Sequence, residues 1–386
     1  MQNDRSGIFG MDKEQQGKID RLFWELFVPG EGEAHLDFAT PGGQRYLIPS
    51  GSIHMGLSLY HPSRMRGKFV KRFLPYMRRS SFLLARIGAR KTALRVSDAL
   101  HALLSDAFGR KDLELAVFCG TPGVHRKITV QVSAGGRVLG YAKISDREEV
   151  KALFAREHTL LNRLRNAGLE NIPRILFCGE LTPGTGIFIQ DTAEREKQLR
   201  GRDTEPLVWD FLSELHAKTA ADIPFGKSGY YHDLQRLKAG LPEFGEKEAR
   251  WLERAADEVE TFFHLRETLF SIYHGDLTPW NTFIHRGRLY AFDWEYARDS
   301  YPPYLDFFHF FTRRAFYEGQ WNAGKTIRKF EENQSGMKKY IPDPRMYYKA
   351  YLLAAIGFYT ARDKKEAFSP ACRFWLDLLN ELNDTP

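Results

Sequence analysis

The chain has 386 residues, 43% of them hydrophobic, and a formal net charge of +7. This length allows two domains, or one two-lobed enzyme with an appendage. The basic charge is concentrated: twelve Lys and Arg but no acidic residue lie between Asp37 and Asp98, and the remainder carries 44 basic against 49 acidic residues. A general nucleic-acid-binding protein would spread its charge differently, so no nucleic-acid partner is expected.

The cysteines and the hydropathy bear on the cellular compartment. The chain has three cysteines, Cys119, Cys178 and Cys372, without the paired spacing of a zinc site or a disulfide framework. The N-terminal segment is charged and lacks the apolar core of a secretory signal. The longest uncharged run of interest, residues 350–361, is shorter than the roughly 20 residues that a membrane-spanning helix needs. We therefore expect a soluble, cytoplasmic protein.

Residues 1–110 form the first predicted part, a basic N-terminal extension. Helical apolar spacing occurs over residues 13–27 and 97–108, and residues 45–49 and 55–60 have the pattern of strands. Runs of Pro, Gly and Ser separate these pieces.

A basic amphipathic helix is predicted within this extension, over residues 64–74, with Pro75 ending it. Its apolar face contains Met65, Phe69, Val70, Phe73 and Leu74, and its basic face contains Arg64, Lys68, Lys71 and Arg72. Such a helix can lie on the anionic inner face of a membrane, as a peripheral contact, or gather a phosphorylated saccharide or lipid. Alternatively it packs its apolar face on the domain and leaves its charges in water.

Residues 111–191 form the second predicted part, a small antiparallel sheet with one long helix. Runs of β-branched residues joined by glycine turns are typical of such a meander. The predicted strands are residues 113–119, 128–132, 138–144, 174–178 and 186–190, and the predicted helix is residues 146–167.

Residues 192–386 form the third predicted part, which is mainly helical. Helices are expected over residues 206–218, 247–269 and 346–362. A short strand-rich insertion, residues 269–296, separates the last two and contains the strongest chemical signal in the chain.

This insertion holds His274-Gly275-Asp276, then Asn281 five residues after Asp276, then Asp293 at the end of a predicted hairpin strand. Phosphoryl transfer requires an oriented acceptor hydroxyl, metal ions on the phosphate oxygens and a cradle for the nucleotide. Asp276 would orient the hydroxyl and accept its proton, while Asn281 and Asp293 would supply oxygen ligands to Mg²⁺. The tripeptide alone would be read as a surface turn, but the two added spacings favour a site.

The pattern resembles the aminoglycoside phosphotransferase and choline kinase family, relatives of the protein kinases. The resemblance covers residues 113–311 and implies an α+β, two-lobed protein-kinase-like fold, a small antiparallel sheet lobe plus a larger helical lobe, here with an N-terminal extension. It implies ATP and Mg²⁺ as cofactors. Asp276 falls on the family's catalytic Asp, Asn281 on its metal-binding Asn, and Asp293 on the acid that corresponds to the protein-kinase DFG aspartate. Asp306 matches a residue expected to be structural or to belong to the substrate lobe.

The resemblance also predicts nucleotide-binding residues in the smaller lobe. Lys143, on the third strand of the second part, would contact the α and β phosphates, and Glu157, fourteen residues later on the helix, would hold it through an ion pair. Each residue alone would be read as a solvated surface side chain, and Glu148 and Glu149 compete with Glu157 for this role. The order of the residues before Asp276 favours the nucleotide site.

A glycine turn, Gly120 to Gly123, is the candidate phosphate loop, because backbone N–H groups can approach phosphates there. A plain β-hairpin turn explains this segment equally well. The segment 189–192, after the fifth predicted strand, is where a hinge between the lobes would meet adenine.

The expected function is therefore a small-molecule kinase that transfers the ATP γ-phosphate to a hydroxyl of a sugar, glycolipid or amino alcohol. The motifs together with the long extension resemble uncharacterised kinases encoded with bacterial surface-polysaccharide functions, which favours a saccharide-like acceptor. Several aromatic residues are expected mostly in the core, although one or two of them could line an acceptor pocket: Trp280, Trp294 and the aromatic run Phe307, Phe308, Phe310 and Phe311.

Two other functions stay open at this stage. A nucleotide-binding pseudokinase or scaffold is less favoured because Lys143, Asp276, Asn281 and Asp293 are all present. A protein kinase is less favoured because no Ala-Pro-Glu segment follows Asp293.

Overall fold

The computed structural model describes residues 13–40, 42–60, 62, 65–195, 205–317, 319–362 and 369–384. The chain divides into two compact units. The first unit contains residues 1–159 and 173–194, and the second contains residues 160–172 and 195–386.

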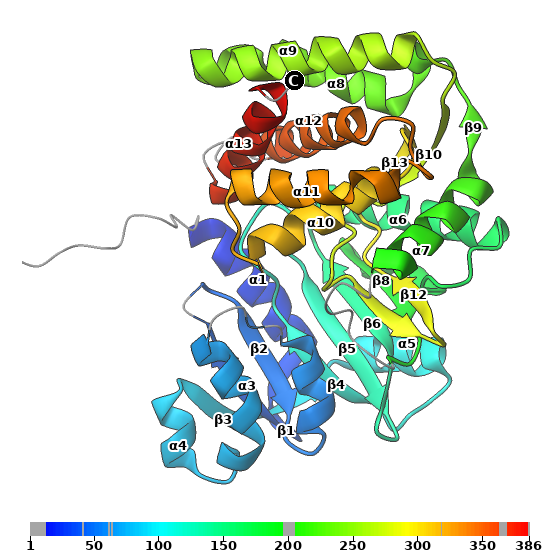
Figure 1. Cartoon of the computed structure of the whole chain (residues 1–386). Coiled ribbons are helices and arrows are strands. Elements are labelled where there is room, and N and C mark those ends of the chain that lie inside the picture. Colours follow the sequence, from blue (N-terminus) through cyan, green and yellow to red (C-terminus); the bar gives the residue numbers. More distant parts are fainter. Residues whose placement is uncertain are drawn as a thin grey trace, which may run out of the picture. The chain divides into compact units, whose positions relative to one another are not determined.

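An eight-stranded sheet forms the body of the first unit (Figure 1). Its order is β3-β1-β2-β4-β5-β6-β8-β7, and every neighbouring pair is antiparallel. The strands are β1 (Phe27–Ala39), β2 (Arg45–Pro49), β3 (Ala89–Val96), β4 (Glu114–Phe118), β5 (Ile128–Ala134), β6 (Arg137–Ser145), β7 (Ile175–Thr182) and β8 (Thr185–Asp191).

Helices cover both faces of this sheet, because successive side chains of a strand point to opposite faces. On one face, α1 (Lys13–Leu26) and α5 (Asp98–Phe108) pack on a core that includes Val130 and Ile189. On the other face, a second core lies under α2 (Ile53–Gly56), η1 (Leu57–Leu59), α3 (Met65–Met77) and α4 (Ser81–Arg86). Helix α6 (Glu148–Asn166) places Phe154 against Phe188 of β8, with ring centroids 6.0 Å apart.

The sheet is larger than the sequence predicted, because three strands of residues 1–110 extend it. Neither β1 nor β3 was predicted. In β1, Pro29, Gly30 and Gly32 interrupt the alternation that identifies a strand. The pairing of β1 with β3 shifts register between Pro29 and Glu33, so the strand accommodates these residues in an irregularity. The three-part functional division of the chain stays a prediction.

Two other local predictions in the extension are wrong. Residues 55–60 are not a strand: the first two belong to α2, and the next three form η1. The reason is that Ile53, Leu57 and Tyr60 recur at helical spacing and are buried together in the second core. Pro75 does not end α3, which continues to Met77. Arg64, the first residue of the predicted basic face, lies outside the described residues.

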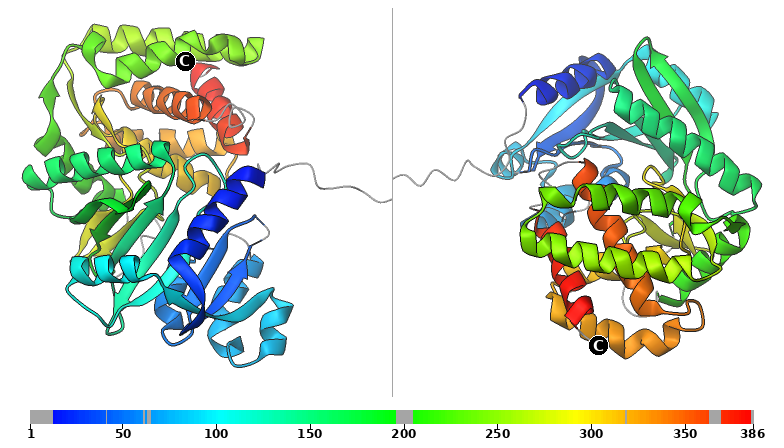
Figure 2. Two further views of the ribbon diagram at one scale, coloured as in Figure 1. Left: turned by 180° about the vertical axis from the view of Figure 1, so that it is seen from behind. Right: turned by 90° about the horizontal axis from the view of Figure 1, so that it is seen from above.

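The second unit is mainly helical, as predicted, with a three-stranded sheet of order β13-β10-β9 and a two-stranded hairpin β11-β12. In Figure 2, α8, α9 and α12 lie together. The helices are α7 (Glu205–Thr219), η3 (Phe225–Lys227), α8 (Gly229–Ala239), η4 (Leu241–Glu243), α9 (Glu246–His264), α10 (Leu305–Tyr317), α11 (Ala323–Met337), α12 (Pro344–Arg362) and α13 (Pro370–Asp384). The strands are β9 (Ala221–Asp222), β10 (Leu269–Tyr273), β11 (Thr282–His285), β12 (Arg288–Ala291) and β13 (Arg298–Tyr301).

The predicted helix over residues 247–269 ends earlier than expected, at His264, and Leu269 instead begins β10. Helices α8, α10, α11 and α13 were not predicted. Among the described residues, no helix is long and apolar enough to cross a membrane.

Candidate active site

A buried ion pair in the first unit joins two of the predicted nucleotide-binding residues. Lys143 Nζ on β6 lies 2.8 Å from Glu157 Oε2 and 3.1 Å from Glu157 Oε1 on α6. Lys143 is 5% exposed and Glu157 1% exposed, and the ammonium lies 5.6 Å from the centroid of the Phe188 ring. The competing Glu148 is paired instead with Lys151. The structure thus selects Glu157 as the partner of Lys143.

The predicted glycine loop lies between β4 and β5. Gly120 has φ +70°, and a Cβ there would come within 2.4 Å of the Lys127 carbonyl oxygen, so both conformation and space require glycine. Gly123 has φ +155° with open space around it. The close approach of Lys127 explains Gly120 without a ligand, and phosphate contact by this loop stays a prediction.

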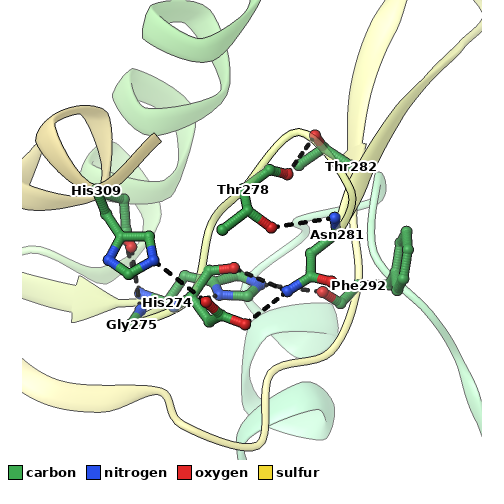
Figure 3. A network of polar contacts seen from close by, with 9 residues as sticks. His274, Gly275, Thr278, Asn281, Thr282, Phe292 and His309 are labelled. Atoms are coloured by element: carbon green, nitrogen blue, oxygen red, sulfur yellow. Dashed lines mark hydrogen bonds and ion pairs between the residues drawn. The ribbon is translucent and has the colours of Figure 1, made fainter. Parts of the chain in front are cut away.

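In the second unit, Asn281 and His309, both labelled in Figure 3, contact the two carboxylate oxygens of Asp276 in the loop after β10. Asn281 Nδ2 donates to Asp276 Oδ2 at 2.8 Å and to the Asp276 carbonyl oxygen at 3.0 Å. His309 Nε2, from α10, lies 3.2 Å from Asp276 Oδ1. The five-residue spacing therefore lets Asn281 bond back to Asp276 and hold its side chain in one orientation. Asp276 itself is half-buried.

The backbone of the same loop is held by Asp306, a fully buried acid at the start of α10. Its carboxylate accepts the His274 N–H at 2.7 Å and the Gly275 N–H at 3.0 Å. Burial raises the pKa of Asp306 to about 7, and these two backbone hydrogen bonds oppose the rise. Gly275 has φ +80°, and a Cβ there would lie 2.7 Å from the Tyr296 carbonyl oxygen. Asp306 is thus a structural residue of the site.

His274 connects the loop to the segment that carries Asp293. Its Nδ1 accepts the Asp276 N–H at 3.2 Å, which places the ring proton on Nε2, and Nε2 lies 3.2 Å from the Phe292 carbonyl oxygen. The Phe292 N–H donates to the Asn281 carbonyl oxygen at 3.1 Å. Burial lowers the pKa of His274 to about 4, so the ring is neutral at pH 7.

These hydrogen bonds hold the backbone of Phe292, the residue directly before Asp293. Asp293 directly follows Phe292 and adopts a left-handed conformation with φ +69°, which is uncommon for a residue other than glycine. The next residue, Trp294, is fully buried, and its ring lies 4.3 Å from that of His274. Backbone strain of this kind gathers at functional sites, where surrounding contacts impose it.

His309 is a residue of the site that sequence reasoning missed. It lies within the aromatic run of α10 that was expected to be core, and it is fully buried. Burial lowers the pKa of His309, so the neutral ring donates from Nε2 to Asp276. Its position three residues after Asp306 was the available signal, because residues three apart lie on one helix face.

The oxygen donors of Asn281 and Asp293 suit Mg²⁺, a hard cation that prefers carboxylate and amide oxygens. Among the described residues, both hydrogen bonds of the Asn281 side chain use its Nδ2 atom, so its amide oxygen remains available as a ligand.

A separate cavity of about 570 Å³ lies between α8 and α12 of the second unit. Its lining includes Asp233, Arg298 and Phe358 but none of Asp276, Asn281 or Asp293. It is therefore distinct from the loop that carries the candidate chemistry.

Comparison with known families decides the class of the protein. Residues 129–334, more than half of the chain, match the model of the phosphotransferase enzyme family. This chain belongs to that family. The match confirms the resemblance to aminoglycoside phosphotransferases and choline kinases, and it confirms that the protein is an enzyme, an ATP-dependent phosphotransferase with hydroxyl acceptors.

Solved structures confirm the kinase-like fold. A thermostable mutant of aminoglycoside phosphotransferase APH(4)-Ia, in a ternary complex with ADP and hygromycin B, is 16% identical and matches 75% of this chain and 100% of its own, with a TM-score of 0.52. The apo form of a thermostable mutant is 16% identical and matches 74% of this chain and 100% of its own, with a TM-score of 0.50. No curated protein sequence matches this chain.

Proposed function

We propose that the protein transfers the γ-phosphate of ATP to a hydroxyl of a saccharide-like acceptor, with Asp276 as the catalytic residue. The observation that carries this proposal is the fixed carboxylate of Asp276, held by Asn281 at one oxygen and by His309 at the other. A carboxylate held in this way can accept a hydrogen bond from the acceptor hydroxyl and take its proton as the phosphorus–oxygen bond forms.

The remaining predicted residues supply the nucleotide end of the reaction. Lys143, kept in place by Glu157, would contact the α and β phosphates of ATP. Asn281 and Asp293 would hold Mg²⁺, which when bound neutralises charge on the phosphate oxygens. The neutral His274 and the buried Asp306 do not take part in proton transfer and instead hold the loop.

An acceptor panel tests this proposal. Purified protein with ATP and Mg²⁺ is incubated with neutral sugars, sugar acids, sugar phosphates, glycolipids, choline and aminoglycosides, and the products are examined by mass spectrometry for one added phosphoryl group. We expect a saccharide-like product, and we expect Asp276→Asn to reduce its rate by about 10²–10⁴-fold. Asp257→Asn, which removes an exposed carboxylate on α9, is the control.

Turnover that survives Asp276→Asn would remove Asp276 from the chemistry. Turnover of choline alone would reject the saccharide-like acceptor.

We also propose that α3 and α4 contact an anionic membrane. Their exposed side chains include Met65 (81%), Phe69 (54%), Tyr76 (79%) and Phe82 (66%). Only part of the predicted apolar face packs on the domain: Leu74 is buried and Val70 is half-buried against the second core. Exposed apolar groups beside Lys and Arg are typical of helices that lie in a membrane interface.

Liposome co-sedimentation tests this second proposal. Wild-type protein should bind vesicles of phosphatidylserine and phosphatidylcholine more than pure phosphatidylcholine vesicles, and Lys68→Gln/Arg72→Gln should lose that preference, because both basic residues are exposed on α3. Lys71 is unsuitable for this variant, since its Nζ donates to the Tyr60 carbonyl oxygen. Equal binding by wild type and variant would exclude the contact.

A further inference from the structure

Arg313 occupies a position next to the catalytic loop that the proposed chemistry does not use. It lies on α10, four residues after His309, and residues four apart lie one turn apart on the same helix face. His309 contacts Asp276, and the Asp276 carboxylate is close enough to act electrostatically on the Arg313 guanidinium. Arg313 therefore lies one helical turn beyond the residue that touches the catalytic carboxylate.

Four aromatic rings from four different elements surround this guanidinium. Its carbon Cζ lies 4.8 Å from the ring centroid of Tyr317, 5.6 Å from that of Trp280, and 5.9 Å from those of Tyr359 and Trp375. Trp280 belongs to the loop that carries Asp276, Tyr317 to α10, Tyr359 to α12 and Trp375 to α13. The rings of Trp280 and Tyr317 meet edge to face, as do planar groups that line a preformed pocket.

In the described part of the chain, Arg313 has no hydrogen-bonded anion beside it. Among the described residues, no hydrogen bond or ion pair reaches its guanidinium, and its Nε is buried without a hydrogen-bond partner. Aromatic faces attract a cation, but they do not accept the directional N–H bonds that a guanidinium fork offers to a carboxylate or phosphate. A half-buried charge in this state is partly desolvated without a hydrogen-bonded anion, and arginine is the side chain suited to bidentate recognition of an anion.

The four rings around Arg313 differ in exposure. Trp375 is 2% exposed and Tyr359 is 8% exposed, so they form the buried part of the cluster. Tyr317 is 48% exposed and Trp280 is half-buried, so these two rings form its solvent-accessible part.

We propose that Arg313 binds a carboxylate or phosphate group of the acceptor, so that the natural acceptor is an anionic sugar. This inference rests on the proposed function, because it assigns the acceptor of the Asp276 site. The guanidinium fork holds the anion, an aromatic ring covers a face of the sugar, and a hydroxyl of the same sugar is presented to Asp276. A cationic acceptor such as an amino alcohol would be repelled by Arg313.

A simpler role for Arg313 is to balance the charge of Asp276. That role predicts an equal effect of Arg313 substitutions on every acceptor, because the charge of Asp276 does not depend on which acceptor is bound. The anion-binding role predicts a loss confined to anionic acceptors and expressed in binding.

Tryptophan fluorescence gives a binding readout that is independent of phosphate transfer, because Trp280 and Trp375 flank Arg313. The probes are D-glucuronate, glucose 6-phosphate, inorganic phosphate and D-glucose, titrated with saturating ADP so that anions do not bind in place of the nucleotide. The variants are Arg313→Gln and Arg313→Lys, and the control is Arg328→Gln, which removes an exposed Arg of α11.

We expect wild type to bind glucuronate or glucose 6-phosphate at least 30-fold more tightly than D-glucose. Arg313→Gln should weaken that binding at least 30-fold, Arg313→Lys should weaken it less because the charge is kept, and Arg328→Gln should leave it unchanged. The tighter of the two anionic sugars identifies the group as carboxylate or phosphate. Inorganic phosphate should bind more weakly than glucose 6-phosphate, because it offers no sugar face to the rings.

Wild type that binds D-glucose as tightly as both anionic sugars would overturn the inference, as would equal weakening by Arg313→Gln and Arg328→Gln. Asp276→Asn should retain anion binding. If anions bind through Arg313 but no acceptor is phosphorylated by wild type, the proposed function fails while anion binding at Arg313 stands.

Discussion

Two cations, the buried Lys143 in the first unit and the half-buried Arg313 in the second, differ in what neutralises them. Lys143 has a carboxylate of the protein within 2.8 Å, supplied by Glu157. Arg313 has four aromatic rings around it and, among the described residues, no carboxylate in hydrogen-bond contact. A cation with an internal partner is held in one position, whereas a cation without one retains its hydrogen-bonding capacity for a ligand.

His274 shows a third way in which the protein manages a buried ionisable group. Burial lowers its pKa to about 4, so the group loses its charge instead of finding a partner. The three residues thus represent a paired charge, a removed charge and an unpaired charge. Their substitutions should have different effects on stability, which makes the comparison testable.

The largest effect on stability is expected for Lys143→Met. Removing one partner of a buried ion pair leaves Glu157 uncompensated and should reduce the free energy of unfolding by about 3–5 kcal/mol. The double variant Lys143→Met/Glu157→Leu should recover most of that loss, because both charges are then gone. Urea denaturation provides the measurement, and Lys111→Met, which replaces an exposed lysine of the first unit, should have little effect.

The same variants separate stability from nucleotide binding. Both the single and the double variant should bind ATP more weakly than wild type in a calorimetric titration. If the double variant binds ATP as tightly as wild type, Lys143 does not contact the phosphates.

An intermediate effect is expected from pH acting on His274. Its folded pKa of about 4 lies below the unfolded value of about 6.5, so the unfolded chain binds the proton more tightly. The stability that this residue contributes is complete above about pH 6.5 and is lost as the pH falls towards 4. Between pH 7.5 and pH 5 the loss should be about 2 kcal/mol.

His274→Asn isolates this contribution, because Asp306 and His309 titrate in both proteins and their effects cancel. The difference in unfolding free energy between the two pH values should be about 2 kcal/mol smaller in the variant than in wild type. The same pH dependence in both proteins would show that His274 is not held neutral in the folded state.

The smallest effect is expected for Arg313→Met. The variant loses the attraction of the rings for a cation but also removes a partly desolvated charge, and replacing desolvated charges by apolar side chains is often neutral. The free energy of unfolding should therefore stay within about 1 kcal/mol of the wild-type value. A loss as large as that of Lys143→Met would mean that Arg313 has a structural role.

The same contrast explains what could be predicted from the sequence. Asp276, Asn281 and His274 interact within one short loop, so their spacing already determines their contacts. The pairing of Lys143 with Glu157 was expected from the family resemblance and from the order of these residues before Asp276, and the structure shows the two side chains in contact.

The residues proposed to bind the acceptor, Arg313 and the rings around it, are not close together in the sequence. Arg313 and its rings come from a loop and three helices, and α10 and α13 were not predicted. Trp280 and the aromatic run of α10 were expected in the core by composition, and only the packing distinguishes a ring that faces Arg313 from one that is merely buried. Strands β1 and β3 were missed for a related reason, since pairing within the sheet compensates for the glycines and the proline in β1.

The most direct test of the account compares Asp276→Asn and Arg313→Gln in steady-state phosphate transfer to one anionic sugar acceptor. The account predicts that Asp276→Asn reduces kcat by about 10²–10⁴-fold with little change in the acceptor KM. It predicts that Arg313→Gln raises the acceptor KM at least 30-fold, with a smaller effect on kcat. Loss of kcat in both variants with an unchanged KM, or full activity of Asp276→Asn, would contradict it.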